Sequence, residues 1–222
     1  MPRKTKEEAL KTRNRLLDAA EWLFQAQGVS RTTLQDIALR AGATRGAVYW
    51  HFKDKSALFN AMVERISLPL EAYFNVEDSP ADTADLGEAS ALDHTRNAIL
   101  MALHQIVNDV RTRRVLEVAT QKVEYIEEHR SIRLRHLAVR NGFLARVRQG
   151  LDAAARHETL TLPLPSAMAA QGLHALIDGL IQNWLLDPEA FDLQQLGRSA
   201  IAIYFCGLGF NCSASMPALP LN

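Results

Sequence analysis

Apolar residues recur every three to four positions along most of the chain, and this spacing restricts the fold more than any other feature of the sequence. Side chains spaced in this way fall on one face of an α-helix. The first such face consists of Leu10, Leu16, Leu17, Ala20, Leu23 and Phe24. No segment has the strict alternation of a half-buried strand. The sequence therefore predicts an all-α protein, and its 222 residues, 48% of them hydrophobic, suffice for one large or two modest domains.

Polar capping residues divide this pattern into separate helices. The starts of the first four predicted helices are marked by Thr5, Thr32-Thr33, Thr44 and Asp54. Such residues accept a hydrogen bond from a free backbone N–H group at a helix start. The fourth helix is predicted from Lys55 to about Leu70, and later helices near 91–110, 113–128, 130–156, 166–186 and 192–210. The acidic segment 77–90 lacks apolar periodicity and is predicted to be a loop.

Residues 33–52 have the features of a helix-turn-helix, the motif that places its second helix in the major groove of DNA. Ala38 is small where the two helices approach, and Gly42 tolerates the backbone angles of a tight turn. Val48 and Phe52, four residues apart, point inward and anchor the second helix. The same pattern also fits a plain pair of helices inside a core, so these residues alone leave both interpretations open.

The opposite arc of the second helix is the candidate DNA-facing surface. At about 100° per residue, Gly46, Tyr49 and Trp50 lie there, with Arg45 at the edge. Gly46 lets the backbone approach DNA, while Tyr and Arg side chains reach phosphates or base edges. The charge distribution favours this interpretation. Residues 1–60 hold 11 Lys and Arg against 6 Asp and Glu, a net charge of +5, whereas the rest hold 14 against 19.

Two stretches of this region, 32–38 and 41–55, resemble the signature of the TetR family of transcriptional regulators. The opening segment 3–9, the run Tyr49-Trp50-His51-Phe52 and the run 111–114 are more narrowly similar to AcrR-like repressors of multidrug efflux operons. The resemblance implies a three-helix DNA-binding domain over 1–54 and a helical ligand-binding and dimerisation domain over 55–210. Residues 211–222 are predicted to be a disordered tail.

The resemblance also implies roles for individual side chains. Thr44, Arg45 and Gly46 are expected to contact bases or their flanking phosphates. Phosphate contacts are expected from Tyr49, His51 and Lys55, with Thr33 assisting. His51 has the alternative of a neutral histidine packed at a helix end. For Trp50, core packing and phosphate contact are both open.

A small hydrophobic or aromatic effector is expected to bind in the second domain. By register with AcrR-like regulators, the predicted lining residues are Ile99, Leu103, Leu116, Thr120, Phe143, Val147, His174, Ile177, Asp178 and Ile181. His174 and Asp178 lie four apart on one face of an apolar segment. A structural hydrogen bond between them is the alternative to a role in ligand binding.

A homodimer is expected because one small headpiece buries too little DNA for specific binding, whereas two headpieces one helical turn apart can read a palindrome. The last two helices carry glycines among large apolar residues, which suits close helix packing, and the interface is predicted there. These glycines are Gly172, Gly179, Gly197, Gly207 and Gly209. The basic runs 111–114 and 130–135 are interpreted as solvated faces or as electrostatic contacts between domains.

The predicted function is repression of a multidrug efflux pump operon, with release of operator DNA when an effector displaces helix 55–70. A TetR-type regulator of a metabolic operon is the alternative. A helical enzyme is a remote alternative because no catalytic motif is present, and a non-specific architectural DNA binder is disfavoured by the zero net charge. No cofactor, metal or catalytic residue is expected. Without a signal peptide or membrane span, the protein is expected to be cytoplasmic. Its two cysteines, Cys206 and Cys212, are interpreted as small apolar side chains that fill space and have no further role.

Overall fold

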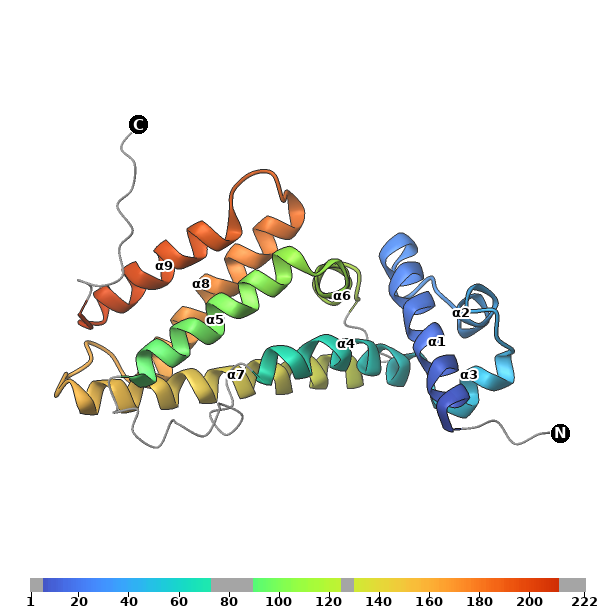
Figure 1. The fold of residues 1–222 in the computed structure, drawn as a ribbon, viewed down its shortest axis with the longest axis horizontal. Helices are drawn as coiled ribbons and strands as arrows, with labels where there is room; N and C mark the ends of the chain where they lie inside the picture. Colours follow the sequence, from blue (N-terminus) through green and yellow to red (C-terminus); the bar gives the residue numbers. More distant parts are fainter. Residues whose placement is uncertain (1–5, 73–89, 125–129, 212–222) are drawn as a thin grey trace. The chain divides into compact units, whose positions relative to one another are not determined.

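The computed structural model describes residues 6–72, 90–124 and 130–211, and within these ranges the chain is helical and contains no strand (Figure 1). The helices are α1 Lys6–Gln27, α2 Leu34–Arg40, α3 Arg45–His51, α4 Lys55–Ala72, α5 Ser90–Asn108, α6 Val110–Gln121, α7 Arg130–His157, α8 Ser166–Leu186 and α9 Leu193–Gly207. The prediction of an all-α fold is confirmed. Thr5, most of the predicted loop 77–90 and nearly all of the predicted tail lie outside the described residues.

The boundary between α5 and α6 differs from the prediction because a single residue, Asp109, separates the two helices. The Asn108 side chain donates to the carbonyl of His104 at 2.8 Å and so competes with the helix backbone at the end of α5. The predicted helix 113–128 ends early, at Gln121. Beyond it, the carbonyl of Lys122 accepts a hydrogen bond from the N–H of Val29 at 3.2 Å, which ties the end of α6 to the α1–α2 loop.

By packing, the chain divides into two compact units. The first contains residues up to 68 together with 110–138, and the second contains 69–109 together with the residues from 139 onward. The chain therefore crosses between the units three times, at 68/69, 109/110 and 138/139. The functional boundary predicted after residue 54 is a different division and stays a prediction.

The core of the first unit forms around α1, which packs against α2, α3 and α6. Leu16, Leu17 and Phe24 of the predicted apolar face are fully buried there. The inward placement of Leu10 was wrong, because this residue is 56% exposed. Trp22 lies off the apolar face, and the guanidinium of Arg40 stacks over its ring at 3.4 Å from the centroid.

In the second unit α9 packs against both α5 and α8. Gly197 of α9 allows this approach, because a Cβ atom there would collide with the side chain of Leu103 in α5. Gly172 of α8 leaves room in the same way for the hydroxyl of Tyr204, which donates to the carbonyl of Ala169 at 2.8 Å. Cys206 takes part in a disulfide bond, so its interpretation as a small apolar side chain with no further role was wrong. Among the described helices, none is long and apolar enough to cross a membrane.

Candidate nucleic-acid interface

The first helix of the motif, α2, is only seven residues long and depends on its N-terminal cap. The Thr33 hydroxyl accepts a hydrogen bond from the Asp36 N–H at 3.1 Å, and the Thr33 N–H donates to the Asp36 carboxylate at 3.0 Å. This reciprocal capping box satisfies two free donors at the helix start. Hydrogen bonds from the side chain and backbone of Thr33 lower the pKa of Asp36.

The turn after α2 requires a glycine. Gly42 has a φ of +59°, in the left-handed region that residues with a Cβ atom rarely adopt. The reversal is closed by a hydrogen bond from the Ala43 N–H to the Ala38 carbonyl at 2.9 Å. The predicted roles of Gly42 as the turn residue and of the buried Ala38 as the close-approach residue are both confirmed.

The second helix, α3, begins at the predicted cap, where the Thr44 hydroxyl accepts from the Ala47 N–H at 3.2 Å. Its inward face holds Val48, which is fully buried, and this face continues into Phe52 just after the helix, which is 4% exposed. Two inward anchors four positions apart fix the rotation of this short helix about its axis. The arrangement of a helix-turn-helix is therefore present, and the plain core hairpin is excluded for α3 by the exposure of its other face.

The outward face of α3 carries the residues that the sequence placed on it. Arg45 and Gly46 are exposed, and Tyr49 and Trp50 are 49% and 72% exposed. Core packing of Trp50, one of its two open interpretations, is therefore wrong. The Arg45 guanidinium lies 3.5 Å from the Tyr49 hydroxyl, at the outer limit of a hydrogen bond, and 5.6 Å from the ring centroid. The hydroxyl raises the pKa of Arg45, whose guanidinium, like that of any arginine, is charged at any working pH.

His51 ends α3 and is half-buried, with its ring between two aromatic neighbours. The Trp50 ring stands edge-on to it at 4.5 Å, and the Phe52 ring is tilted at 6.1 Å. Its position at the helix end agrees with packing as well as with a phosphate contact.

The structure gives Lys55 a different role from the predicted phosphate contact. Its ammonium donates to the carbonyls of Val29, Ser30 and Thr32 at 2.8, 3.2 and 3.1 Å. An ammonium has three N–H donors, and here all three are directed into the α1–α2 loop. Lys55 therefore closes this loop onto the start of α4, and these three hydrogen bonds compete with the predicted phosphate contact.

Thr33 is exposed, but its hydroxyl donates to the Asp36 carboxylate at 2.7 Å. The hydroxyl proton is thus already used by the capping box, and a phosphate contact would have to come from the backbone at this helix start.

The ten predicted effector-lining residues do not fall in one compact unit. Leu116 and Thr120 belong to α6 of the first unit, where Leu116 packs against the core. The other eight belong to the second unit. Four of them are buried, namely Ile99, Leu103, Val147 and Ile177. The rings of Phe143 and His174 meet edge-on at 5.5 Å, while Asp178 and Ile181 are half-buried.

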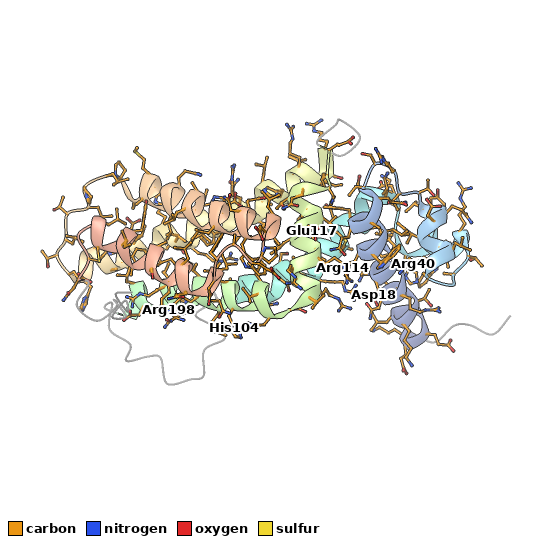
Figure 2. The ribbon with its side chains drawn as sticks, turned by 90° about the horizontal axis from the view of Figure 1, so that it is seen from above. Asp18, Arg40, His104, Arg114, Glu117 and Arg198 are labelled. Atoms are coloured by element: carbon orange, nitrogen blue, oxygen red, sulfur yellow. The ribbon has the colours of Figure 1, made fainter. Side chains whose placement is uncertain are left out.

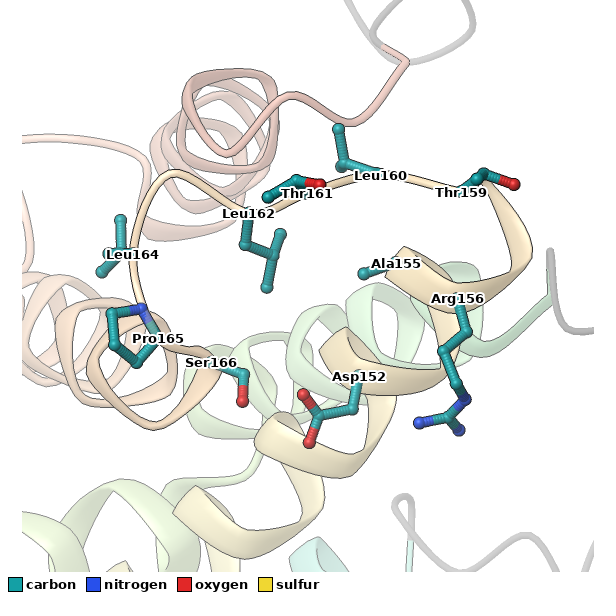
Figure 3. A pocket seen from close by; sticks show the side chains of 10 residues that line it. All are labelled: Asp152, Ala155, Arg156, Thr159, Leu160, Thr161, Leu162, Leu164, Pro165 and Ser166. Atoms are coloured by element: carbon teal, nitrogen blue, oxygen red, sulfur yellow. The ribbon is translucent and has the colours of Figure 1, made fainter.

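A hollow of about 540 Å³ lies elsewhere in the second unit, between the end of α7, the loop after it and the start of α8 (Figure 3). It is lined by Asp152, Ala155, Arg156, Thr159, Leu160, Thr161, Leu162, Leu164, Pro165 and Ser166. None of these belongs to the predicted effector-lining set.

The basic run 111–114 makes contacts inside the first unit. Figure 2 shows Arg114 and Asp18 at the junction of α6 and α1. Arg111 forms ion pairs with Asp18 and Glu21, and Arg114 donates to Gln25 at 2.9 Å. Glu21 was not among the residues predicted from the sequence. A glutamate between Ala20 and Leu23, in the middle of an apolar helix face, was the signal that could have identified it.

Two family models match the chain. Residues 16–62 match the model described as bacterial regulatory proteins, tetR family, and residues 90–210 match the C-terminal region of MAATS-type transcriptional repressors. The chain is 37% identical over 213 residues to the transcriptional regulator AcrR of Shigella flexneri, a match that covers 91% of this chain and 92% of that protein.

Solved structures agree with these matches. NalD, the secondary repressor of the MexAB-OprM multidrug efflux pump in Pseudomonas aeruginosa, is 36% identical, with a TM-score of 0.78 over 91% of this chain and 98% of that chain. SmeT in complex with triclosan is 29% identical, with a TM-score of 0.76 over 95% of this chain and 99% of that chain. Together with the helix-turn-helix of α2 and α3, these matches show that the chain belongs to the TetR family of bacterial transcriptional regulators.

Proposed function

We propose that the protein is a repressor that binds a palindromic operator as a homodimer, with α3 in the major groove, and that a small hydrophobic or aromatic effector releases it. The observation that carries this proposal is the outward face of α3, where Trp50 is 72% exposed and Tyr49 49% exposed beside Arg45. Two exposed aromatic side chains on a seven-residue helix do nothing for the core, whereas DNA offers them phosphates and base edges.

Within this proposal, Thr44, Arg45 and Gly46 contact bases or flanking phosphates because they form the N-terminal end of the recognition helix. Tyr49, Trp50 and His51 hold the phosphate backbone alongside, and the capped start of α2 at Thr33 offers backbone N–H groups to another phosphate. The buried side chains of Val48 and Phe52 prevent α3 from rotating about its axis. The DNA-contacting groups on its outer face therefore keep one common direction.

The homodimer is supported by the outer surfaces of α8 and α9. Large apolar side chains are exposed on both helices: Met168, Leu186, Leu196 and Ile203 are 61%, 73%, 40% and 64% exposed. Gly179 and Gly207 have open space where a Cβ atom would stand, so nothing in their own chain requires a glycine there. A second copy packing closely against these helices supplies a reason for both features.

The effector class and the regulated operon are proposed from the relatives together with the second unit. NalD is described as a repressor of a multidrug efflux pump, and SmeT is known in complex with triclosan. We place an aromatic effector of this kind against the apolar and aromatic residues of α5, α7 and α8, with Phe143, His174 and Asp178 orienting it. The proposed target is an efflux-pump operon, which the protein binds in the cytoplasm. Binding of the effector in the second unit displaces α4 and so releases the operator.

The test is a titration of the protein against the duplex upstream of its own gene and against a shuffled duplex of equal length, at one salt concentration, with and without triclosan. The proposal expects affinity for the upstream duplex at least about a thousandfold above that for the shuffled one. Triclosan should lower only the specific affinity. Equal affinities for both duplexes would eliminate the operator model.

A further inference from the structure

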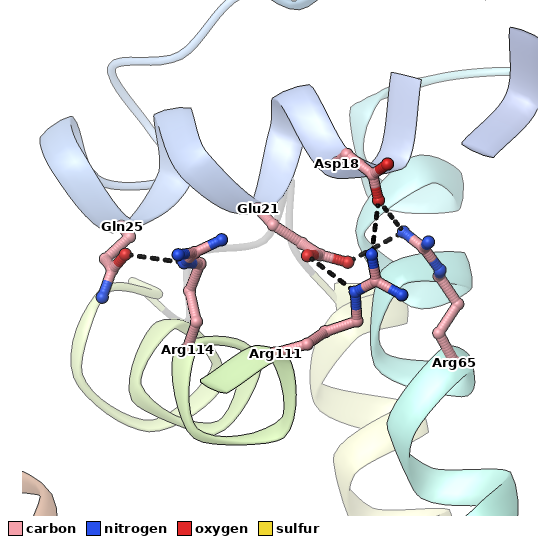
Figure 4. A network of polar contacts seen from close by, with 6 residues as sticks. All are labelled: Asp18, Glu21, Gln25, Arg65, Arg111 and Arg114. Atoms are coloured by element: carbon pink, nitrogen blue, oxygen red, sulfur yellow. Dashed lines mark hydrogen bonds and ion pairs between the residues drawn. The ribbon is translucent and has the colours of Figure 1, made fainter. Parts of the chain in front are cut away.

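Glu21 is a charged residue placed where an apolar one is expected. It lies on the inner face of α1, and its side chain is only 2% exposed. Its carboxylate is 2.9 Å from the Arg65 guanidinium of α4 and 3.4 Å from that of Arg111 of α6. Figure 4 marks both ion pairs with dashed lines. A single buried carboxylate on α1 is therefore held from two other helices at once.

Neighbouring polar groups extend this cluster but lie nearer to water. Asp18, one turn before Glu21, pairs with the same two arginines at 2.8 and 3.1 Å, yet its side chain is 49% exposed. Gln25, one turn after it, accepts from Arg114 at 2.9 Å and donates to Glu117 at 2.7 Å. The chain thus provides an internal comparison, because Asp18 and Glu21 share partners and helix but differ in burial.

Burial works against the charged form of Glu21. Burial raises the pKa of Glu21, and Asp18 raises it further, while Arg65, Arg111 and Arg114 lower it without restoring the ordinary value. The ion pairs therefore do not fully offset the loss of hydration. Buried ion pairs of this kind are weak evidence for stability, and the best-attested reason for keeping them is to fix one arrangement of the parts.

The partners of Glu21 stand beside the points where the chain crosses between its two compact units. Arg65 lies three residues before the crossing at 68/69, and Arg111 lies one residue after the crossing at 109/110. Pro69 has no backbone N–H, so the carbonyl of Arg65 lacks its helical partner at that crossing. At the third crossing, Arg135 of α7 donates to Ser67 of α4 at 2.9 Å.

We propose that Glu21 is a positioning residue for DNA binding: its carboxylate fixes α1, and with it the recognition helix, to the two chain crossings that carry Arg65 and Arg111. Movement at either crossing reaches the helix-turn-helix through this carboxylate. The inference rests on the proposed operator-binding function. Beyond that function, we infer that the charge of the Glu21 carboxylate, together with the packing of α1, sets the orientation in which α1, α2 and α3 meet DNA.

Protonation of Glu21 removes both ion pairs at once. The ionisable groups in this cluster are Asp18 of α1, Arg65 of α4, and Arg111, Arg114 and Glu117 of α6. Because the pKa of Glu21 is raised, its proton returns at a higher pH than for an exposed carboxyl group as the pH falls. Operator affinity should therefore contain a step that depends on Glu21 and weakens binding toward acid pH.

The experiment measures operator affinity for the full-length wild type, Glu21→Gln and the matched control Asp18→Asn between about pH 8 and about pH 5, with thermal unfolding of each. If the neutral amide leaves about one headpiece in three correctly oriented, a dimer loses about tenfold in affinity, because both headpieces must be correct. Glu21→Gln should show this loss at neutral pH without a lower melting temperature, and its pH profile should lack the acid step. Asp18→Asn should keep the step and lose less than about twofold.

A Glu21→Gln variant that binds like the wild type at every pH would overturn the inference, while specific binding by the wild type would leave the proposed function standing. A wild type without operator preference would instead overturn the proposed function, and the inference with it. If Glu21→Gln does not fold, Arg111→Gln replaces it, since this side chain is 47% exposed and its loss leaves the core intact. Unchanged affinity and an unchanged acid step in that variant would equally refute the role of Glu21.

Discussion

Replacing Lys55 by methionine separates its structural role from the phosphate contact expected from its sequence position. The ammonium closes the α1–α2 loop through three carbonyls, those of Val29, Ser30 and Thr32. Hydrogen bonds to a charged group contribute about 1.5–3 kcal/mol, and partial exposure of this site lets water replace some of that. We expect Lys55→Met to lower the free energy of unfolding by about 2 kcal/mol, which corresponds to about 4–8 °C in a chain of this size.

The assay that distinguishes the two roles is operator affinity as a function of salt. A lysine that neutralises a phosphate contributes about 0.9 to the slope of log affinity against log salt, so two of them in a dimer contribute about 1.8. Lys55→Met should leave the slope unchanged while lowering the melting temperature. Lys53→Met, an exposed control two residues away, should leave the melting temperature unchanged. A Lys55→Met variant with wild-type stability and a slope reduced by about two would refute the loop-closing role.

Three further predictions concern the motif and the dimer. Gly42→Ala should destabilise the protein by about 1 kcal/mol because φ is +59° there, and thermal unfolding that matches the wild type would contradict this. Thr33→Ala should remove the part of the acid sensitivity that is due to Asp36. The pKa of Asp36 is lower in the folded than in the unfolded protein, so its carboxylate stabilises the fold above its unfolded-state pKa. This stabilisation is lost as the pH falls through the folded-state pKa. If Thr33→Ala loses as much stability between neutral and acid pH as the wild type does, this would count against the capping box. Ile203→Asp should convert the dimer into monomers in sedimentation, and a variant that stays dimeric would move the interface away from α9.

The local part of the fold could be predicted because its causes are local. Thr33, Thr44 and Asp54 cap helices through residues three positions ahead, and Gly42 is required by its own backbone angle. The face of α3 followed from the spacing of its apolar residues. In these cases sequence distance and spatial distance are nearly the same, so the chemistry of neighbouring residues was sufficient.

The remainder depended on contacts between residues far apart in the chain. Glu21 meets Arg65 and Arg111, which are 44 and 90 positions away, and no pattern in the sequence joins them. Lys55 was expected to contact phosphate from the family resemblance, and the sequence did not show that three backbone carbonyls of the α1–α2 loop lie within reach of its ammonium. Leu116 was placed in the effector site by register with AcrR-like regulators, and the sequence did not reveal the core against which it packs.

The most direct test of the central claim, that the outward face of α3 reads the operator, is the affinity of Arg45→Ala for the upstream duplex and for a shuffled duplex. Arg45 is exposed, so the variant should fold and dimerise like the wild type. Loss of one side chain that contacts bases costs about 1–3 kcal/mol in each half-site, and specific affinity should fall by at least about tenfold while non-specific affinity changes far less. A folded, dimeric Arg45→Ala that binds the upstream duplex as tightly as the wild type would show that another surface recognises DNA.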